Sequence, residues 1–202
     1  MIEFTLSKIN LLILVIALFS IISFFTLNVG KIFLVGEVRQ ELEKYSLTLN
    51  GMVIAPTTCD SKPFAIPSKY SSFGNNVYYT LHISKAQTSL ENRLIFTVSD
   101  VRSPNNVLAA SSLSTNAEIV VYDLIGGTVV PLADLEELVL DPQSVPPRNA
   151  FYVVKSVTEG KETLHIFPCA ITSSSQTCFG SGSIKEQVSN YLVLNGGNNF
   201  IC

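Results

Sequence analysis

The clearest pattern in the chain is an apolar run near its start. No charged residue lies between Lys8 and Lys31. A helix that crosses a bilayer needs about 20 apolar residues, whereas a cleavable signal has an apolar region of about 7–15 residues and then a small-x-small cleavage site. The run ends in FFTLN and contains no such site. We therefore expect a retained helix, either a membrane anchor or the stalk of a filament, rather than a cleaved signal.

The apolar residues of this run occupy every face of a helix, which argues against a buried core helix with one polar side. The residues expected to face lipid or neighbouring copies are Leu11, Leu12, Ile13, Leu14, Val15, Ile16, Leu18, Phe19, Ile21, Ile22, Phe24 and Phe25. Lys and Arg are balanced on its two sides, so the positive-inside rule does not assign its orientation.

The helical pattern continues beyond the run in amphipathic form. In KIFLVGEVRQELEKYSL, apolar residues recur at spacings of 3, 3, 4 and 3, which places them on one face of a helix. These residues are Ile32, Val35, Val38, Leu42 and Tyr45. We predict one helix from about Lys8 to Tyr45, whose second half offers this stripe to a folded domain.

The rest of the chain alternates apolar and polar residues as β-strands do. The clearest strands are NVYYTLHISK, NRLIFTVSDV and AEIVVYDLI, and AFYVVKSVTEGKETLHIFPC reads as a hairpin turning at Glu159-Gly160. YSLTLNGMVIAP also alternates and predicts a strand, and residues 59–75 predict a loop. PLADLEELVLDP predicts a short helix, and the final YLVLNGGNNFIC predicts a strand or a packed tail.

These patterns predict an α+β fold, in which a long helix, transmembrane and then amphipathic, packs on a mostly antiparallel, β-sandwich-like head. Residues 1–45 form the helix, and residues 46–202 form a head outside the cytoplasm. The head is long enough for one domain with its own core. Charged residues make up 14% of the chain, the net charge is −3, and no Lys/Arg cluster occurs, which argues against a nucleic-acid partner.

All four cysteines lie beyond the apolar run, as disulfides in an oxidising compartment would. We favour a Cys169–Cys178 bond around a short Ser-rich loop, which leaves Cys59 to pair with Cys202. Reduced thiols are the alternative. No spacing matches a zinc site, so we expect no metal.

Candidate catalytic residues are few. The two histidines, His82 and His165, fall on the polar faces of their strands, and no G-x-S-x-G motif occurs. Asp134, Glu137 and Asp141 would share one face of the predicted short helix, but they lack the rhythm of a calcium loop. We expect no catalytic site, no cofactor and no small-molecule substrate.

The layout of residues 4–45 resembles the type IV pilin superfamily, including archaeal pilins and bacterial pseudopilins. In that family the N-terminal helix is apolar first and amphipathic later, and a β-rich head packs on its second half. Phe4-Thr5-Leu6 and the following apolar run look similar to the N-terminal sequences of that family. Glu3 stands where the family has a small residue before the cleavage point, and Lys8 stands where it has a glutamate.

The resemblance implies a cell-surface filament subunit that self-associates through its helix, with membrane lipid as its other partner. A membrane-anchored accessory subunit or binding domain of a larger complex is the first alternative. A tethered extracytoplasmic hydrolase is the second, and it requires a cleft that brings His82 or His165 to a carboxylate.

Overall fold

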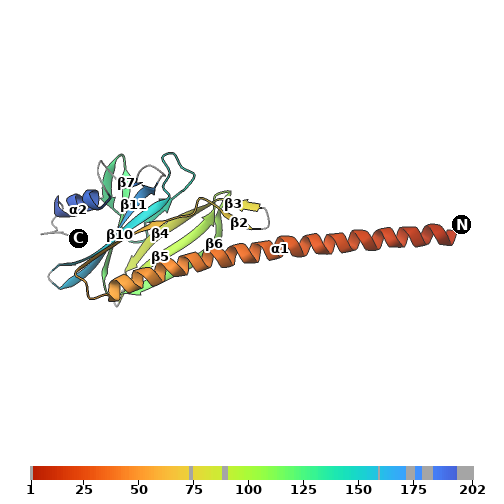
Figure 1. The fold of residues 1–202 in the computed structure, drawn as a ribbon, viewed down its shortest axis with the longest axis horizontal. Coiled ribbons are helices and arrows are strands. Elements are labelled where there is room, and N and C mark those ends of the chain that lie inside the picture. Colours follow the sequence, from red (N-terminus) through yellow and green to blue (C-terminus); the bar gives the residue numbers. More distant parts are fainter. Residues whose placement is uncertain are drawn as a thin grey trace.

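The computed structural model describes residues 2–72, 75–87, 91–158, 160–171, 176–178 and 184–194. One unbroken helix, α1 (Ile2–Ile54, 53 residues), projects from a β-rich head and gives the molecule an elongated shape (Figure 1). The predicted α+β class, with a long helix packed on mostly antiparallel sheets, is confirmed.

The head contains two main sheets. The first has the order β1-β10-β11-β7-β8, with β12 also paired to β11, and the second has the order β6-β5-β4-β9. Only β11 and β7 pair in parallel among the described pairs of strands. A small β2-β3 hairpin lies beside α1 where the helix enters the head (Figure 1). The strands are β1 (Cys59–Ala65), β2 (Tyr70–Ser72), β3 (Asn75–Val77), β4 (Tyr79–Gln87), β5 (Asn92–Asp100), β6 (Ser103–Thr115), β7 (Glu118–Ile125), β8 (Thr128–Pro131), β9 (Glu137–Leu140), β10 (Ala150–Thr158), β11 (Lys161–Ile171) and β12 (Gln176–Thr177).

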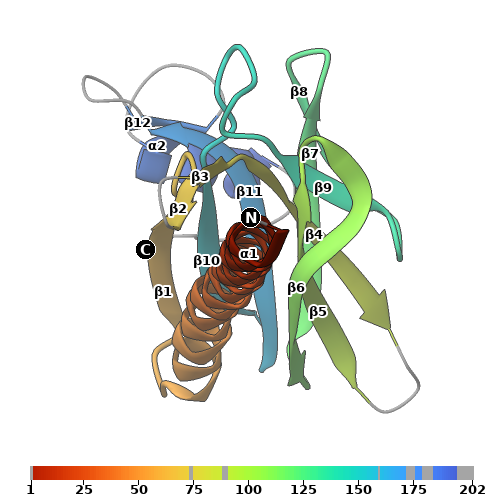
Figure 2. The ribbon, with the colours of Figure 1, turned by 90° about the vertical axis from the view of Figure 1, so that its right-hand side faces the viewer.

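The second half of α1 fills the space between the two sheets, as the view along the helix shows (Figure 2). Its buried residues follow one another at spacings of 4, 4, 3, 4 and 3 residues. One stripe of the helix therefore faces the core over five turns. That stripe comprises Leu34, Val38, Leu42, Tyr45, Leu49 and Met52.

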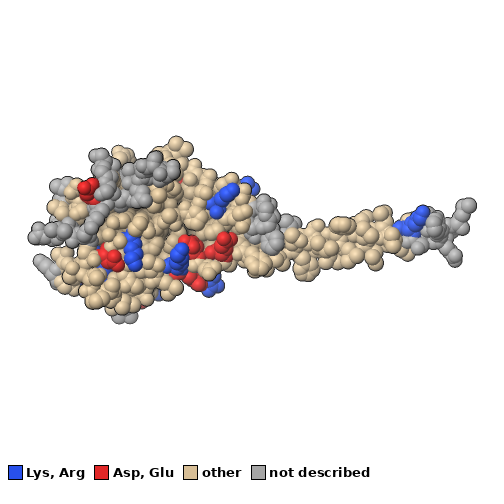
Figure 3. Space-filling view, viewed as in Figure 1, with Lys and Arg blue, Asp and Glu red and all other residues tan. Residues whose placement is uncertain are grey.

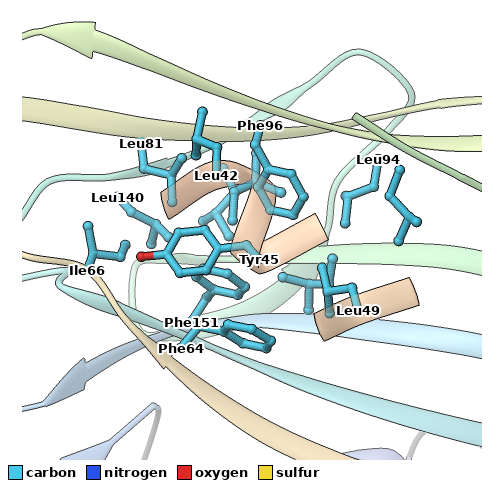
Figure 4. Packing of buried hydrophobic residues seen from close by; sticks show 14 of the residues in the cluster. Leu42, Tyr45, Leu49, Phe64, Ile66, Leu81, Leu94, Phe96, Leu140 and Phe151 are labelled. Carbon is cyan, nitrogen blue, oxygen red and sulfur yellow. The ribbon is translucent and has the colours of Figure 1, made fainter. Parts of the chain in front are cut away.

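Tyr45 lies at the centre of this core (Figure 4). Its ring packs edge-on against Phe64 and Phe151, at centroid distances of 5.6 and 5.5 Å, and these two rings stack on each other at 4.8 Å. Phe96 of the second sheet approaches from the other side at 6.4 Å. The Tyr45 hydroxyl donates a hydrogen bond of 3.0 Å to the carbonyl of Ala65, so its polar end is satisfied. One helical side chain thus joins both sheets.

The structure corrects the predicted stripe at one end and the predicted helix at the other. Ile32 is 70% exposed because it lies before the helix reaches the head, and Leu34 is the first fully buried position instead. Val35 is half-buried. The helix ends at Ile54 rather than Tyr45. The alternating YSLTLNGMVIAP is helical up to Ile54 because Leu49 and Met52 continue the buried stripe.

Three further segments differ from their predictions. Residues 59–75 contain strands β1 and β2, and Pro63 is tolerated there because β1 is an edge strand. Residues 131–142 do not form a helix: a turn with Leu135 at φ 67° leads into β9. The C-terminal run contributes to a helix, α2 (Ile184–Leu194), which covers the outer face of the first sheet through Val188 and Leu192.

A buried lysine fastens the end of α1 to the first sheet. Lys155 is 1% exposed, and its Nζ donates hydrogen bonds to the carbonyls of Val53 (2.9 Å) and Ala55 (2.7 Å). Glu162 Oε1 lies 3.1 Å from the same nitrogen. The last carbonyls of a helix lack partners within it and carry partial negative charge, so a cation there stabilises the helix end.

Replacing Lys155 with Met should therefore lower the free energy of unfolding by about 2–3 kcal/mol, because two carbonyls at the helix end lose a charged donor. Lys161→Met is the matched control, since Lys161 is on the surface and pairs only with Glu118 among the described residues (3.0 Å). It should change stability by less than about 0.5 kcal/mol. Urea unfolding of the full chain in detergent, followed by tyrosine fluorescence, measures both, and equal losses would contradict the role assigned to Lys155.

Candidate functional site

The first half of α1 is an exposed apolar surface. Every residue predicted to face lipid or neighbouring copies is exposed, from 39% at Val15 to 68% at Phe19. Within the described residues, α1 is the one helix long and apolar enough to cross a membrane, and its most apolar window has no part buried by the head. Its visible face between the N-terminal lysine and the head carries no charged side chain (Figure 3). The Thr26 hydroxyl donates to the carbonyl of Ile22 (2.8 Å), which satisfies it without water.

The apolar surface extends beyond the predicted run to the base of the head. Ile32 and Phe33 are 70% and 62% exposed, and both lie immediately before Leu34, the first buried residue of the helix. From Ile9 to Phe33 the helix rises about 36 Å, which exceeds the roughly 30 Å hydrocarbon core of a bilayer. Lys31, which directly precedes these two residues on the helix, is also exposed. We call Lys31, Ile32 and Phe33 the neck.

A groove of about 990 Å³ lies between α1 and the β2 segment, on the side of the head that faces the neck. From the helix it is lined by Glu37, Glu41, Lys44 and Leu47, and from the strand side by Lys69 and Tyr70, among others. Acidic side chains gather where the helix enters the head (Figure 3). Burial, and to a lesser degree the Glu41 carboxylate, raises the pKa of Tyr70 to about 12. On the helix side the charged lining residues are Glu37, Glu41 and Glu43 against Lys44, so that side is negative overall.

His82 belongs to a hydrogen-bonded network on the outer face of the second sheet. Its Nδ1 lies 2.8 Å from Glu137 Oε2, and its Nε2 lies 3.0 Å from the Ser99 hydroxyl and 3.0 Å from the Thr80 hydroxyl. Serine, imidazole and carboxylate thus stand in the order that a hydrolase triad uses. Ser99 is only 2% exposed, however, and its hydroxyl also bonds Thr80 at 2.9 Å. The nucleophile position is closed to a substrate in this arrangement.

This network was missed because residues 131–142 were predicted to be a helix. As a strand, β9 pairs with β4 and sets Val139 opposite His82, and the Glu137 carboxylate reaches the imidazole. The three carboxylates predicted to share a helix face are separated instead. Asp134 pairs with Lys85 (3.5 Å), and Asp141 accepts from the Gln143 amide (2.8 Å). Across the described ranges, no group of three potential metal ligands occurs.

His165 lies on β11 of the other sheet, under α2. Its Nδ1 is 3.0 Å from the Tyr122 hydroxyl and its Nε2 is 3.2 Å from the Ser156 hydroxyl. Tyr122 and Phe167 stack face to face at 4.4 Å beside it. Burial lowers the pKa of His165 from 6.5 to about 4, although Glu118 opposes this shift.

The predicted Cys169–Cys178 disulfide is confirmed. It joins the end of β11 to the segment before α2 and lies in the same cluster as Tyr122 and Phe167. Cys59 is also disulfide-bonded. Its predicted partner, Cys202, lies outside the described residues.

Comparison of the chain with protein-family models, with curated proteins and with solved structures gives no match. The resemblance to pilins therefore depends on the sequence pattern alone.

We expect the stability of the head to fall as the pH drops from 6.5 towards 4. In this window the unfolded chain protonates His165 while the folded chain keeps it neutral, so unfolding takes up a proton. The contribution of this residue is up to about 1.4 kcal/mol per pH unit. His165→Gln should reduce the slope of unfolding free energy against pH, measured by urea titrations at several pH values. A slope identical to that of the wild type would show that His165 does not control it.

Proposed function

We propose that this protein is a structural subunit of a cell-surface filament, with its helix as the polymer core and its β head displayed outside. The observation that carries this proposal is the continuity of α1, which runs for 53 residues from an exposed apolar segment into the centre of the head. A simple tether needs no such rigidity, because any flexible linker would hold a domain at a membrane. A rigid helix built into the core transmits load from the head to the helix, which a filament requires.

In this proposal the apolar half of α1 occupies two different environments. It lies in membrane lipid before assembly and against the same segment of other copies afterwards. Both suit a helix that is apolar on every side, and small hydroxyls such as Thr26 are tolerated in either medium. The disulfide Cys169–Cys178 fits an oxidising extracytoplasmic location for the head. No enzymatic activity is assigned, and the buried hydroxyl of Ser99 gives the hydrolase alternative little support.

Shearing native cells tests the proposal. We expect the protein to leave the cells in filaments that electron microscopy resolves and immunoblotting identifies. If it stays with the membrane until detergent is added, and then elutes in a fixed ratio to other proteins, the anchored accessory subunit is the correct function.

A pair of insertions after Gly30 separates rigid coupling from simple tethering. Gly-Gly-Ser-Gly interrupts the helix, whereas four alanines lengthen it equally and keep it helical. We expect both variants to remain in the membrane fraction, and only the alanine variant to yield filaments. Equal filament yields from the two would contradict the role of the continuous helix.

A further inference from the structure

We infer that the neck of one copy docks into the groove of a second copy, with Lys31 facing Glu37 and its acidic neighbours. This inference rests on the proposed function, and it names the contact that joins successive heads. The neck consists of Lys31, Ile32 and Phe33, and the groove is the one between α1 and the β2 segment.

The first argument is charge complementarity between two parts of the same chain. Lys31 is exposed on the neck, and Glu37 lines the groove. Neither forms an ion pair with any residue that the structure describes. The other two helix carboxylates of this region already have partners on α1, since Glu41 lies 3.6 Å from Lys44 and Glu43 lies 3.0 Å from Arg39. Glu37 is therefore the carboxylate left available to an incoming cation.

The second argument is the apolar surface that flanks both charges. Ile32 and Phe33 stand exposed beside Lys31, just beyond the length that a bilayer core covers. Leu47, which lines the groove, is 71% exposed. Each side of the contact thus offers apolar area together with one unpaired charge of opposite sign. Burying these side chains would remove apolar surface from water while pairing the charges.

The third argument is geometric. The neck and the groove are different surfaces of one chain, so their contact is heterologous and leaves a free neck and a free groove at the two ends of any assembly. Such contacts build open helical filaments unless the rotation closes a ring. With parallel helices, Lys31 comes level with residues 37–41 of its neighbour at an axial offset of about 9–15 Å. The groove opens at the neck end of the head, where a neighbour displaced by this amount would place its helix.

Charge reversal tests the contact. Lys31→Glu and Glu37→Lys should each reduce the filament protein released by shearing at least about tenfold, because like charges then meet at the interface. The double variant carrying both changes should recover most of the loss. Lys62→Glu is the matched control, since Lys62 is an exposed lysine on β1 away from the neck and the groove, and it should shear as the wild type does. All four variants should stay in the membrane fraction before assembly.

A second measurement locates the contact directly. Filaments grown from a mixture of ¹⁴N- and ¹⁵N-labelled copies are treated with a carbodiimide, which joins a lysine to a carboxylate without a spacer. We expect mixed-isotope peptides that link Lys31 to Glu37 or Glu41.

The outcomes separate the two proposals. If the wild type releases no filaments, the proposed function fails and this contact fails with it. If the wild type forms filaments but both single reversals shear normally and no mixed Lys31 peptide appears, the filament stands and the neck-to-groove contact is wrong.

Discussion

The head depends on the second half of α1, because the helix supplies the middle of its hydrophobic core. The two sheets meet directly where β7 contacts β4, β5 and β9, and elsewhere Tyr45, Leu42 and Leu49 of α1 pack against both of them. Tyr45 contacts aromatic rings from both sheets, and Phe96 of the second sheet also lies 6.2 Å from Phe151 of the first. Without the helix, each sheet would expose an apolar face to water, at a cost of roughly 25 cal/mol per Å². Lys155 adds a polar fastening at the point where the helix ends.

The two halves of α1 require different surroundings. The segment before the neck is apolar on all sides and is stable only in lipid or against other apolar helices. The segment after Phe33 has one apolar stripe, from Leu34 to Met52, which is buried against the head. Because both belong to one helix without a break, the position of the head is fixed by the position of the apolar segment. In the filament that we propose, units built in this way stack through the inferred contact between neck and groove.

Features with a strong periodicity of hydrophobic residues were predicted from the sequence, whereas features decided by tertiary contacts were missed. The apolar run, the stripe at Val38 and Leu42 and the β10–β11 hairpin follow from local pattern. The extension to Ile54 was missed because Ser46, Thr48 and Asn50 alternate with apolar residues, which also fits a strand. Strand β9 was missed because Leu132, Leu135 and Leu138 occur at helical spacing, and only pairing with β4 selects the extended form. Of the candidate surfaces, the apolar run was predictable, but the groove was not, because it forms between segments brought together by folding.

Hydrogen–deuterium exchange on the full chain in detergent tests the integral role of α1 most directly. If the helix is part of the core, the amides of residues 34–52 open only when the whole head unfolds, so they should exchange as slowly as those of β4 and β10. The result that would contradict this account is rapid exchange of residues 34–52, at the rate of a separate peripheral helix, while the central strands remain protected.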